Sequence, residues 1–134
     1  MDFAAVMALV QRAEEREWPS EKALARLFRR LVSDLGYDLY VAEQNGEVCG
    51  VVMVGYRRLL LQGGLCAMLD GVITAKSEAE IGQQLIAFAK ERARKKGCRL
   101  VQALVSGQRG EEWGRLLSAA GFTPAGEWFS CPLI

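Results

Sequence analysis

The chain has 134 residues, of which 51% are hydrophobic and 25% charged, and its formal net charge is +1. This composition is ordinary for a soluble globular protein, and the near-zero charge gives no general argument for binding nucleic acid or an anionic membrane. The sequence contains no histidine, which excludes Ser-His-Asp and Cys-His catalysis and histidine-based zinc sites. A general base must therefore be a carboxylate, tyrosine, cysteine, lysine or a chain of waters.

Length and patterning lead us to expect that residues 1–134 form one cytoplasmic domain. No apolar run approaches the roughly 20 residues of a membrane helix, and the start, MDFAAVMALVQRAEEREW, lacks the basic region of a signal peptide. The cysteines lie in apolar segments without a C-x-x-C pair, at Cys49, Cys66, Cys98 and Cys131. We interpret them as buried, reduced thiols and expect no metal site.

Two helices are predicted at the start of the chain. Residues 3–16 carry an apolar stripe at helical spacing, made of Phe3, Val6, Met7 and Val10. After the break at Trp18-Pro19, Ser20 is expected to cap a second helix that ends at Gly36 as its C-terminal cap. The apolar stripe of this second helix consists of Leu24, Leu27, Phe28 and Leu31.

From Asp38 onward the apolar period changes to two, which predicts strands. The runs DLYVAEQ and EVCGVVMVGY flank Asn45-Gly46, a pair that suits the primed turn of a hairpin. The run LLLQGGLCAML repeats this arrangement, and its second strand continues to about Thr74 with Asp70 near the middle. We therefore predict three consecutive antiparallel strands over residues 38–74.

The second half of the chain predicts one long helix and three shorter elements. The long helix, residues 77–96, should pack across the sheet and end at Gly97, and its stripe consists of Ile81, Leu85, Phe88, Ala89 and Ala93. The run CRLVQALV predicts a strand, EEWGRLLSAA a short helix and EWFSCPL a final strand. The order α-α-β-β-β-α-β-α-β indicates an α/β domain with a mixed, mostly antiparallel sheet and a crossover helix.

This order, with "VAEQNGEVCGVVMV" leading to "MLDGVIT", a helix and then "LLSAAGF", resembles the GNAT superfamily of acyl-CoA N-acyltransferases. The resemblance covers about residues 1–133 and includes the passage AKERARKKGCRLV from long helix to strand. We expect the first strand common in the family to be missing, since the first element predicted from the sequence is a helix. The resemblance implies a GNAT-like fold and transfer of an acetyl group from acetyl-CoA to a small-molecule or protein amine.

The resemblance also implies roles for particular residues. Asp70 lies on the strand where related enzymes often hold a carboxylate that takes the amine proton, so it is the candidate catalytic residue. The main chain of Ile73 and Thr74 is expected to pair with the pantetheine arm and to polarise the thioester carbonyl. The pyrophosphate is expected at the start of the long helix, at Ile81, Gly82, Gln83 and Gln84. From the residues alone, Asp70 is alternatively a polar side chain that faces solvent or caps a loop.

The family's Arg/Gln-x-x-Gly-x-Gly/Ala loop aligns with residues 77–82, where only Ile81-Gly82 fits. Ser77 and Glu80 instead form a capping box, either as ordinary capping or as an adaptation that excludes acyl-CoA. Leu117 stands where the family often carries a tyrosine that protonates the leaving thiolate. Two functions therefore stay open: a divergent acetyl-CoA-dependent N-acetyltransferase, or a non-catalytic GNAT-fold binding or regulatory module that has lost acyl-CoA binding.

The basic run within residues 90–99 contains no aromatic residue. We interpret it as a solvated face whose cations suit a helix C-terminus, because nucleic-acid sites interleave basic and aromatic residues. We expect no nucleic-acid or membrane partner, and a homodimer is left open.

Overall fold

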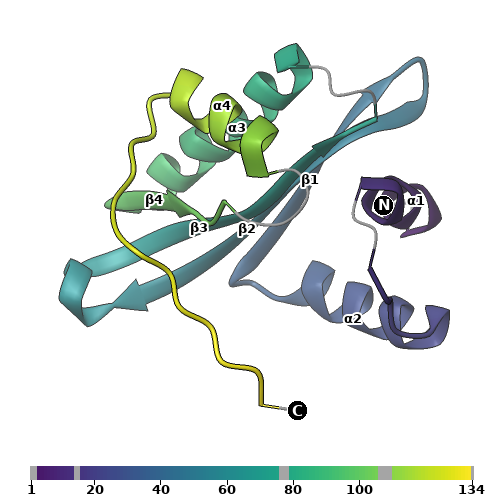
Figure 1. Cartoon of the computed structure of the whole chain (residues 1–134), viewed down its shortest axis with the longest axis horizontal. Coiled ribbons are helices and arrows are strands. Elements are labelled where there is room, and N and C mark those ends of the chain that lie inside the picture. The colour runs from purple at the N-terminus through teal and green to yellow at the C-terminus, as the bar shows by residue number, and fades with distance from the viewer. Residues whose placement is uncertain (1–2, 14–15, 76–78, 106–109, 134) are drawn as a thin grey trace.

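A four-stranded sheet in the order β1-β2-β3-β4 organises the chain (Figure 1). The computed structural model describes residues 3–13, 16–75, 79–105 and 110–133. Its elements are α1 (Phe3–Ala13), α2 (Glu21–Ser33), β1 (Tyr37–Gln44), β2 (Glu47–Leu59), the 3-10 turn η1 (Leu60–Gln62), β3 (Gly64–Thr74), α3 (Ala79–Lys95), β4 (Leu100–Ala103) and α4 (Gly110–Ala119). Strands β1, β2 and β3 pair antiparallel in sequence order, whereas β4 is parallel to β3. The predicted three antiparallel strands and mixed sheet are confirmed.

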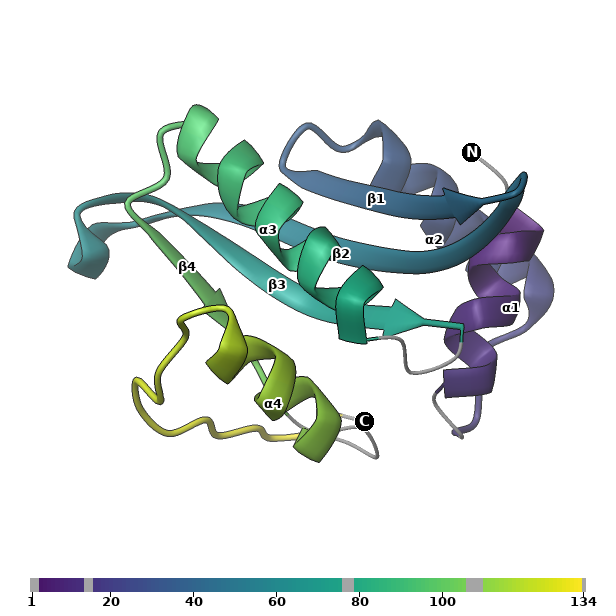
Figure 2. The same ribbon diagram turned by 90° about the horizontal axis from the view of Figure 1, so that it is seen from above.

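Helices cover both faces of this sheet. Helix α3 lies across β1, β2 and β3 on one face with α4 beside it, and α1 and α2 lie on the other face (Figure 2). Strands β1, β2 and β3 contribute side chains to the hydrophobic cores on both faces of the sheet, because alternate residues of a strand point to opposite faces. In β2, Val52 and Val54 join the core under α3, while Val51 joins Val6 and Phe28 in the core under α1 and α2.

The predicted final strand is wrong. Residues 123–133 form no helix or strand and are exposed throughout. The apolar pattern of EWFSCPL suits a strand, but a strand also needs a neighbour to pair with its main chain, and no described strand lies beside these residues. Cys131, expected to be buried, is exposed on this segment, and all four cysteines are free thiols.

The structure confirms the predicted hairpin turn and the predicted N-terminal cap of α2, but not the predicted end of that helix. Asn45 and Gly46 both have positive φ, 54° and 81°, as a primed hairpin turn requires. The Ser20 hydroxyl accepts a hydrogen bond from the Ala23 amide at 3.2 Å, which confirms the predicted cap of α2. The predicted end of α2 at Gly36 is wrong: the helix ends at Ser33 with Asp34 as its cap. The Asp34 carboxylate then accepts from the Gly36 amide at 2.8 Å, which ends the helix early.

Helix α3 approaches the sheet closely because a glycine lies beneath it. A Cβ on Gly50 would lie 2.9 Å from the Leu85 Cδ1 atom, so a side chain there would force the buried Leu85 side chain to shift. Leu85 is buried as predicted, but Phe88 is 50% exposed and stacks edge-on against Tyr40 at 4.9 Å between ring centroids. Ile86, omitted from the predicted stripe, is fully buried in its place. The buried face of α3 is thus rotated away from Phe88, which lies at the margin over β1.

A polar cluster ties the C-terminal end of α3 to β1. The Tyr40 hydroxyl donates to the Asp38 carboxylate at 2.5 Å, and the Lys96 ammonium lies 3.5 Å from that carboxylate. Burial would raise the pKa of Asp38, but the Tyr40 hydrogen bond and the Lys96 charge are among the contacts that hold it below its usual value. Within the described residues, no helix combines the length and apolar character needed to cross a membrane.

Alanine substitutions on α3 test this orientation. We expect Ile86→Ala to lower the free energy of unfolding by about 2–5 kcal/mol, because it leaves a cavity in a closed core. Phe88→Ala should cost less, because half of that ring already contacts water. Denaturant unfolding of both variants gives the comparison, and a larger loss at Phe88 would contradict the observed orientation.

Candidate functional site

Strands β3 and β4 separate at their carboxyl ends. Their ladder joins residues 66–69 to residues 100–103 and stops there, although β3 continues to Thr74. Figure 2 shows β4 turning away toward α4 while β3 runs on toward the start of α3. In open α/β sheets, ligands commonly bind outside the carboxyl ends of parallel strands. This opening is therefore the candidate functional site.

A β-bulge lies on β3 where the two strands separate. Val54 of β2 is opposite Leu69 and Met53 is opposite Gly71, so Asp70 is the extra residue of the bulge. Bulges often re-aim a side chain beside an active site. Asp70 is exposed. The structure thus places the candidate base on β3 directly after the last residue that pairs with β4.

The bulge also decides which peptide groups of β3 face the opening. The Ala75 amide donates to the Cys49 carbonyl at 2.9 Å, so residue 75 bonds to β2. In an antiparallel ladder such bonding occurs at every second residue, which directs the peptide groups of Ile73 toward β2 as well. Those of Val72 and Thr74 point to the side that β4 has left. Of the two residues expected to meet a pantetheine arm, Thr74 faces this side and Ile73 faces β2.

Tyr37 reaches Asp70 across a glycine. Tyr37 of β1 is opposite Gly55 of β2, and its Cδ2 and Cε2 atoms lie 3.7 and 3.9 Å from where a Gly55 Cβ would be. Burial, the charge of Asp70 and a hydrogen bond with Asp70 raise the pKa of Tyr37 above its ordinary value. The hydroxyl therefore stays protonated at neutral pH and donates to the Asp70 carboxylate.

Tyr37 was not a candidate in the sequence. It precedes Asp70 by a whole hairpin, and nothing in the spacing links the two residues. Gly55, in the strand between them, has no side chain and so leaves room for Tyr37 to reach Asp70. The sequence indicates this only if the register of both strand pairs and the position of the bulge are known.

The first turns of α3 are engaged in packing. Ile81 is buried against the sheet, and a Cβ on Gly82 would lie 3.1 Å from the Leu116 Cδ1 atom of α4. The Gln83 side chain donates to the Leu116 carbonyl at 2.9 Å. Gln84 is exposed, and so is Glu80 in the first turn. The close contact between α3 and α4 therefore explains why a glycine is present at position 82.

Two expectations from the sequence concern groups near this turn. Ser77 lies outside the described residues, so the capping box is not described. Leu117, in the position where the family often carries a proton-donating tyrosine, is 5% exposed and belongs to the core under α3. That position therefore contributes packing.

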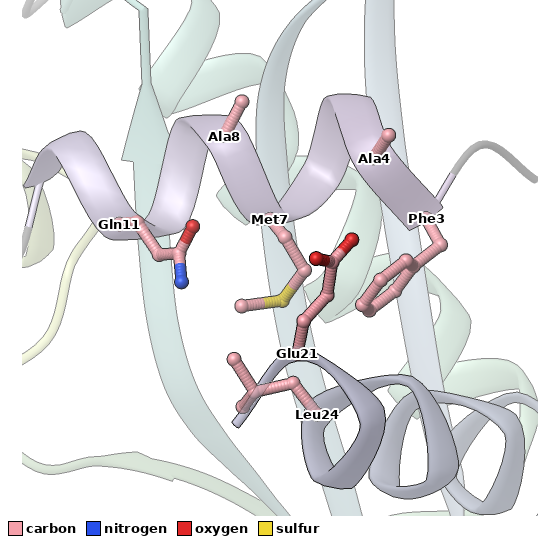
Figure 3. Close-up of a pocket in the computed structure, with 7 residues that line it drawn as sticks. All are labelled: Phe3, Ala4, Met7, Ala8, Gln11, Glu21 and Leu24. Carbon is pink, nitrogen blue, oxygen red and sulfur yellow. The ribbon is translucent and has the colours of Figure 1, made fainter. Parts of the chain in front are cut away.

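A shallow hollow of about 240 Å³ lies between α1 and α2. In Figure 3 the Glu21 carboxylate and the Met7 thioether point into it, together with the Phe3 ring. All of its lining residues belong to these two helices, Phe3, Ala4, Met7, Ala8, Gln11, Glu21 and Leu24. It is smaller than the roughly 300–1,000 Å³ of typical ligand pockets and contains neither Asp70 nor Tyr37, so it is not the candidate site.

The chain is similar to several solved structures along nearly its whole length. The chain is similar to a transcriptional regulator from Bacillus halodurans C-125, with 25% identity, a TM-score of 0.84 and coverage of 98% of this chain and 93% of that one. It is similar to a putative acetyltransferase from Agrobacterium tumefaciens str. C58, with 20% identity, a TM-score of 0.81 and the same coverage, 98% and 93%. It is also similar to AAC(6')-Iy in complex with the bisubstrate analogue CoA-S-monomethyl-acetylneamine, with 18% identity, a TM-score of 0.79 and coverage of 97% and 90%.

No curated protein matches the sequence. The family model of the acetyltransferase (GNAT) family matches residues 3–111, which is more than half of the chain. The mixed four-stranded sheet flanked by helices is the GNAT fold shared with these structures. The chain belongs to the GNAT family of acetyltransferases.

Proposed function

We propose that this protein is an acetyl-CoA-dependent N-acetyltransferase that acts on an amine, with Asp70 as its general base. The observation that carries the proposal is the position of Asp70 in the bulge of β3, where β4 turns away. Amine acetylation needs a base, because an ammonium group has no free electron pair for attack on a carbonyl carbon. With histidine absent from the chain, an exposed carboxylate at the opening is the suitable group.

The residues around the opening have different proposed roles in the reaction. Asp70 accepts a proton from the amine, directly or through water. Tyr37 donates a hydrogen bond to Asp70 and fixes the orientation of its carboxylate, so we assign it a positioning role. Acetyl-CoA, when bound, supplies the acetyl group as a thioester. A thiolate is a fair leaving group, so a buried leucine at position 117 is compatible with the reaction.

The described residues suit the pantetheine arm of acetyl-CoA along β3 better than they suit its pyrophosphate at the start of α3. The peptide groups on the open side of β3 suit an extended pantetheine arm, which could bind there like an added strand. We assign this contact to Val72, whose peptide groups point to the side that β4 leaves, and no longer to Ile73. At the start of α3, Glu80 opposes a pyrophosphate, although helix N-termini otherwise favour anions. The proposal therefore includes weak binding of acetyl-CoA.

The second candidate is a GNAT-fold binding or regulatory module that has lost acyl-CoA. Two observations favour it: the acidic Glu80 in the first turn of α3, and the use of Gly82 and Gln83 for packing against Leu116. Family membership and the Asp70–Tyr37 pair favour the enzyme. Binding of acetyl-CoA separates the two candidates.

Calorimetric titration with acetyl-CoA tests the binding. We expect saturable binding by the wild type and about two- to five-fold tighter binding by Glu80→Gln, because a charge in the first turn of a helix contributes about 0.3–1 kcal/mol. Glu91→Gln, a carboxylate on the same helix ion-paired with Arg94, is the matched control and should not change the affinity. The gain at Glu80 should shrink in high salt. Absence of binding in the wild type and in Glu80→Gln would favour the non-catalytic module.

Removing the proposed base tests catalysis. Asp70→Asn should lower the rate of thiol release from acetyl-CoA by roughly 10²-fold, which is typical for a positioned general base. The assay uses a panel of primary amines that includes neamine, the acceptor part of the analogue bound to AAC(6')-Iy. Glu43→Gln, an exposed carboxylate at the end of β1, is the control and should retain full activity. An Asp70→Asn enzyme as fast as the wild type would remove Asp70 from the mechanism.

An alkaline titration tests the Tyr37–Asp70 pair without any substrate. Phenolate absorbance, compared between wild type and Tyr37→Phe, isolates the pKa of Tyr37, which we expect above the ordinary value of about 10. Asp70→Asn should lower this pKa, because it removes a negative charge beside the hydroxyl. The folded state then holds a proton that the unfolded state releases, so the free energy of unfolding should fall as the pH rises past about 10, less steeply in Asp70→Asn. An unchanged Tyr37 pKa in that variant would contradict the pair.

A further inference from the structure

The face of the sheet that carries Asp70 extends beyond α1 and α2. Figure 1 shows these two helices beneath one end of the sheet, while β4 and the hairpin between β2 and β3 lie at the other end. In β4, Val101 and Ala103 pack against the core under α3, so Leu100 and Gln102 project from the opposite face. Leu100 is 37% exposed and Gln102 is partly exposed. This part of the face is therefore accessible to a ligand.

The strand register arranges the side chains of this accessible face in two rows beyond Asp70. The nearer row crosses the sheet through Tyr37, Gly55, Met68 and Gln102. The next row consists of Arg57, Cys66 and Leu100. A ligand whose amine lies at Asp70 and whose body follows the strands would cross the first row and end at the second.

Asp70 and Arg57 lie on the same face and carry opposite charges. Val51 belongs to the core under α1 and α2, and Arg57 is an even number of residues further along β2, so its side chain points to that face. Tyr37 brings its hydroxyl to Asp70 on this face across Gly55. The step along β3 from Cys66, the residue opposite Arg57, to Asp70 corresponds to about 13 Å.

Arg57 is available to bind a ligand. Its side chain is exposed, and the ion pairs found within the described part of the chain do not include it. A second cation lies at the same end of the sheet, because the Arg99 Cδ atom is 3.0 Å from where a Cβ of Gly64 would be. Met68 and Leu100 provide apolar surface between this end and Asp70. An arginine fork binds carboxylates and phosphates through two parallel hydrogen bonds.

We propose that the amine acceptor carries an oxyanion, a carboxylate or a phosphate, about 13 Å from its amino nitrogen, and that Arg57 binds this group. The inference rests on the proposed N-acetyltransferase function, because the amine end is assigned to Asp70. The Asp70 carboxylate attracts the ammonium group, Arg57 attracts the oxyanion, and the body of the acceptor lies on Met68. A cationic group in place of the oxyanion would be repelled by Arg57, so the arrangement disfavours polycationic amines.

Short peptides provide matched pairs that test this acceptor class. Extended tetraalanine places its carboxylate about 13 Å from its amine, and tetraalanine amide lacks only the negative charge. Calorimetric titration without acetyl-CoA compares their affinities, and thiol release in the presence of acetyl-CoA compares their kcat/KM values. We expect the wild type to favour the acid about two- to five-fold in both measurements, the range of an exposed ion pair. Ala-Ala-Ala-phosphoserine amide tests the phosphate alternative in the same way.

Variants at neighbouring positions isolate the contribution of Arg57. Arg57→Gln should lose the preference for the acid and keep the affinity for the amide, whereas Arg57→Lys, which keeps the charge without the fork, should be intermediate. Arg58→Gln is the matched control, because Tyr56 packs against the core under α3 and Arg58 shares that opposite face. It removes the same charge and should keep the preference. The melting temperature of each variant establishes that it is folded.

The two measurements separate this inference from the proposed function. Equal binding of acid and amide by the wild type, no binding of either oxyanion peptide, or a preference that survives Arg57→Gln would overturn the inference. Acetylation of the acid and the amide at equal rates would also overturn it, although acetyl transfer itself would then be established. Binding of an oxyanion peptide through Arg57 without acetylation would contradict the proposed acetyl transfer and would support Arg57 as the oxyanion-binding residue.

Discussion

One extra residue in β3 is the constraint on which both cores and the site depend. Val54 pairs with Leu69 and Met53 with Gly71, which leaves Asp70 as the residue of the bulge. Before the bulge, Leu69 points into the core under α3. After it the alternation is reset, so that Val72 returns to that core and the next residue enters the core under α1. If the same residues alternated regularly, with no bulge at Asp70, Val72 and Ile73 would face the wrong layers.

The same insertion explains why the site lies at this point of the sheet. It turns the peptide groups of Val72 toward the side that β4 leaves, just past the last pair of that ladder, Leu69 with Ala103. It also brings Asp70 within reach of Tyr37, which Gly55 allows to lie across the middle strand. Base, positioning hydroxyl and open main chain thus follow from one local irregularity.

Two glycines allow the close packing of α3 against the sheet and of α4 against α3. Gly50 lets α3 approach the sheet, and Gly82 lets α4 approach α3 through Leu116. A glycine at the start of α3 therefore serves packing, whether or not an anion binds nearby. The layer is completed by Leu117 and Phe122, after which the chain leaves the core with its aromatic residues exposed. Among the strands that the structure describes, β4 pairs only with β3.

The amino-acid sequence determined what depends on local periodicity and turn chemistry. The strands around Asn45-Gly46, the cap at Ser20 and the order of the elements follow from backbone preferences and alternation, which act over a few residues. The family resemblance rested on that order.

Only the tertiary structure decided the features that depend on register between distant segments. The alternation in EWFSCPL predicted a strand, but a strand needs a partner, and no strand in the described part of the chain pairs with this segment. The exposure of Phe88 depends on how α3 is rotated over β1, and the Tyr37–Asp70 contact depends on a bulge that no short-range pattern reveals. These three features depend on long-range pairing and packing. The contacts that stabilise them join segments that meet only in the folded chain, so a local sequence pattern does not contain them.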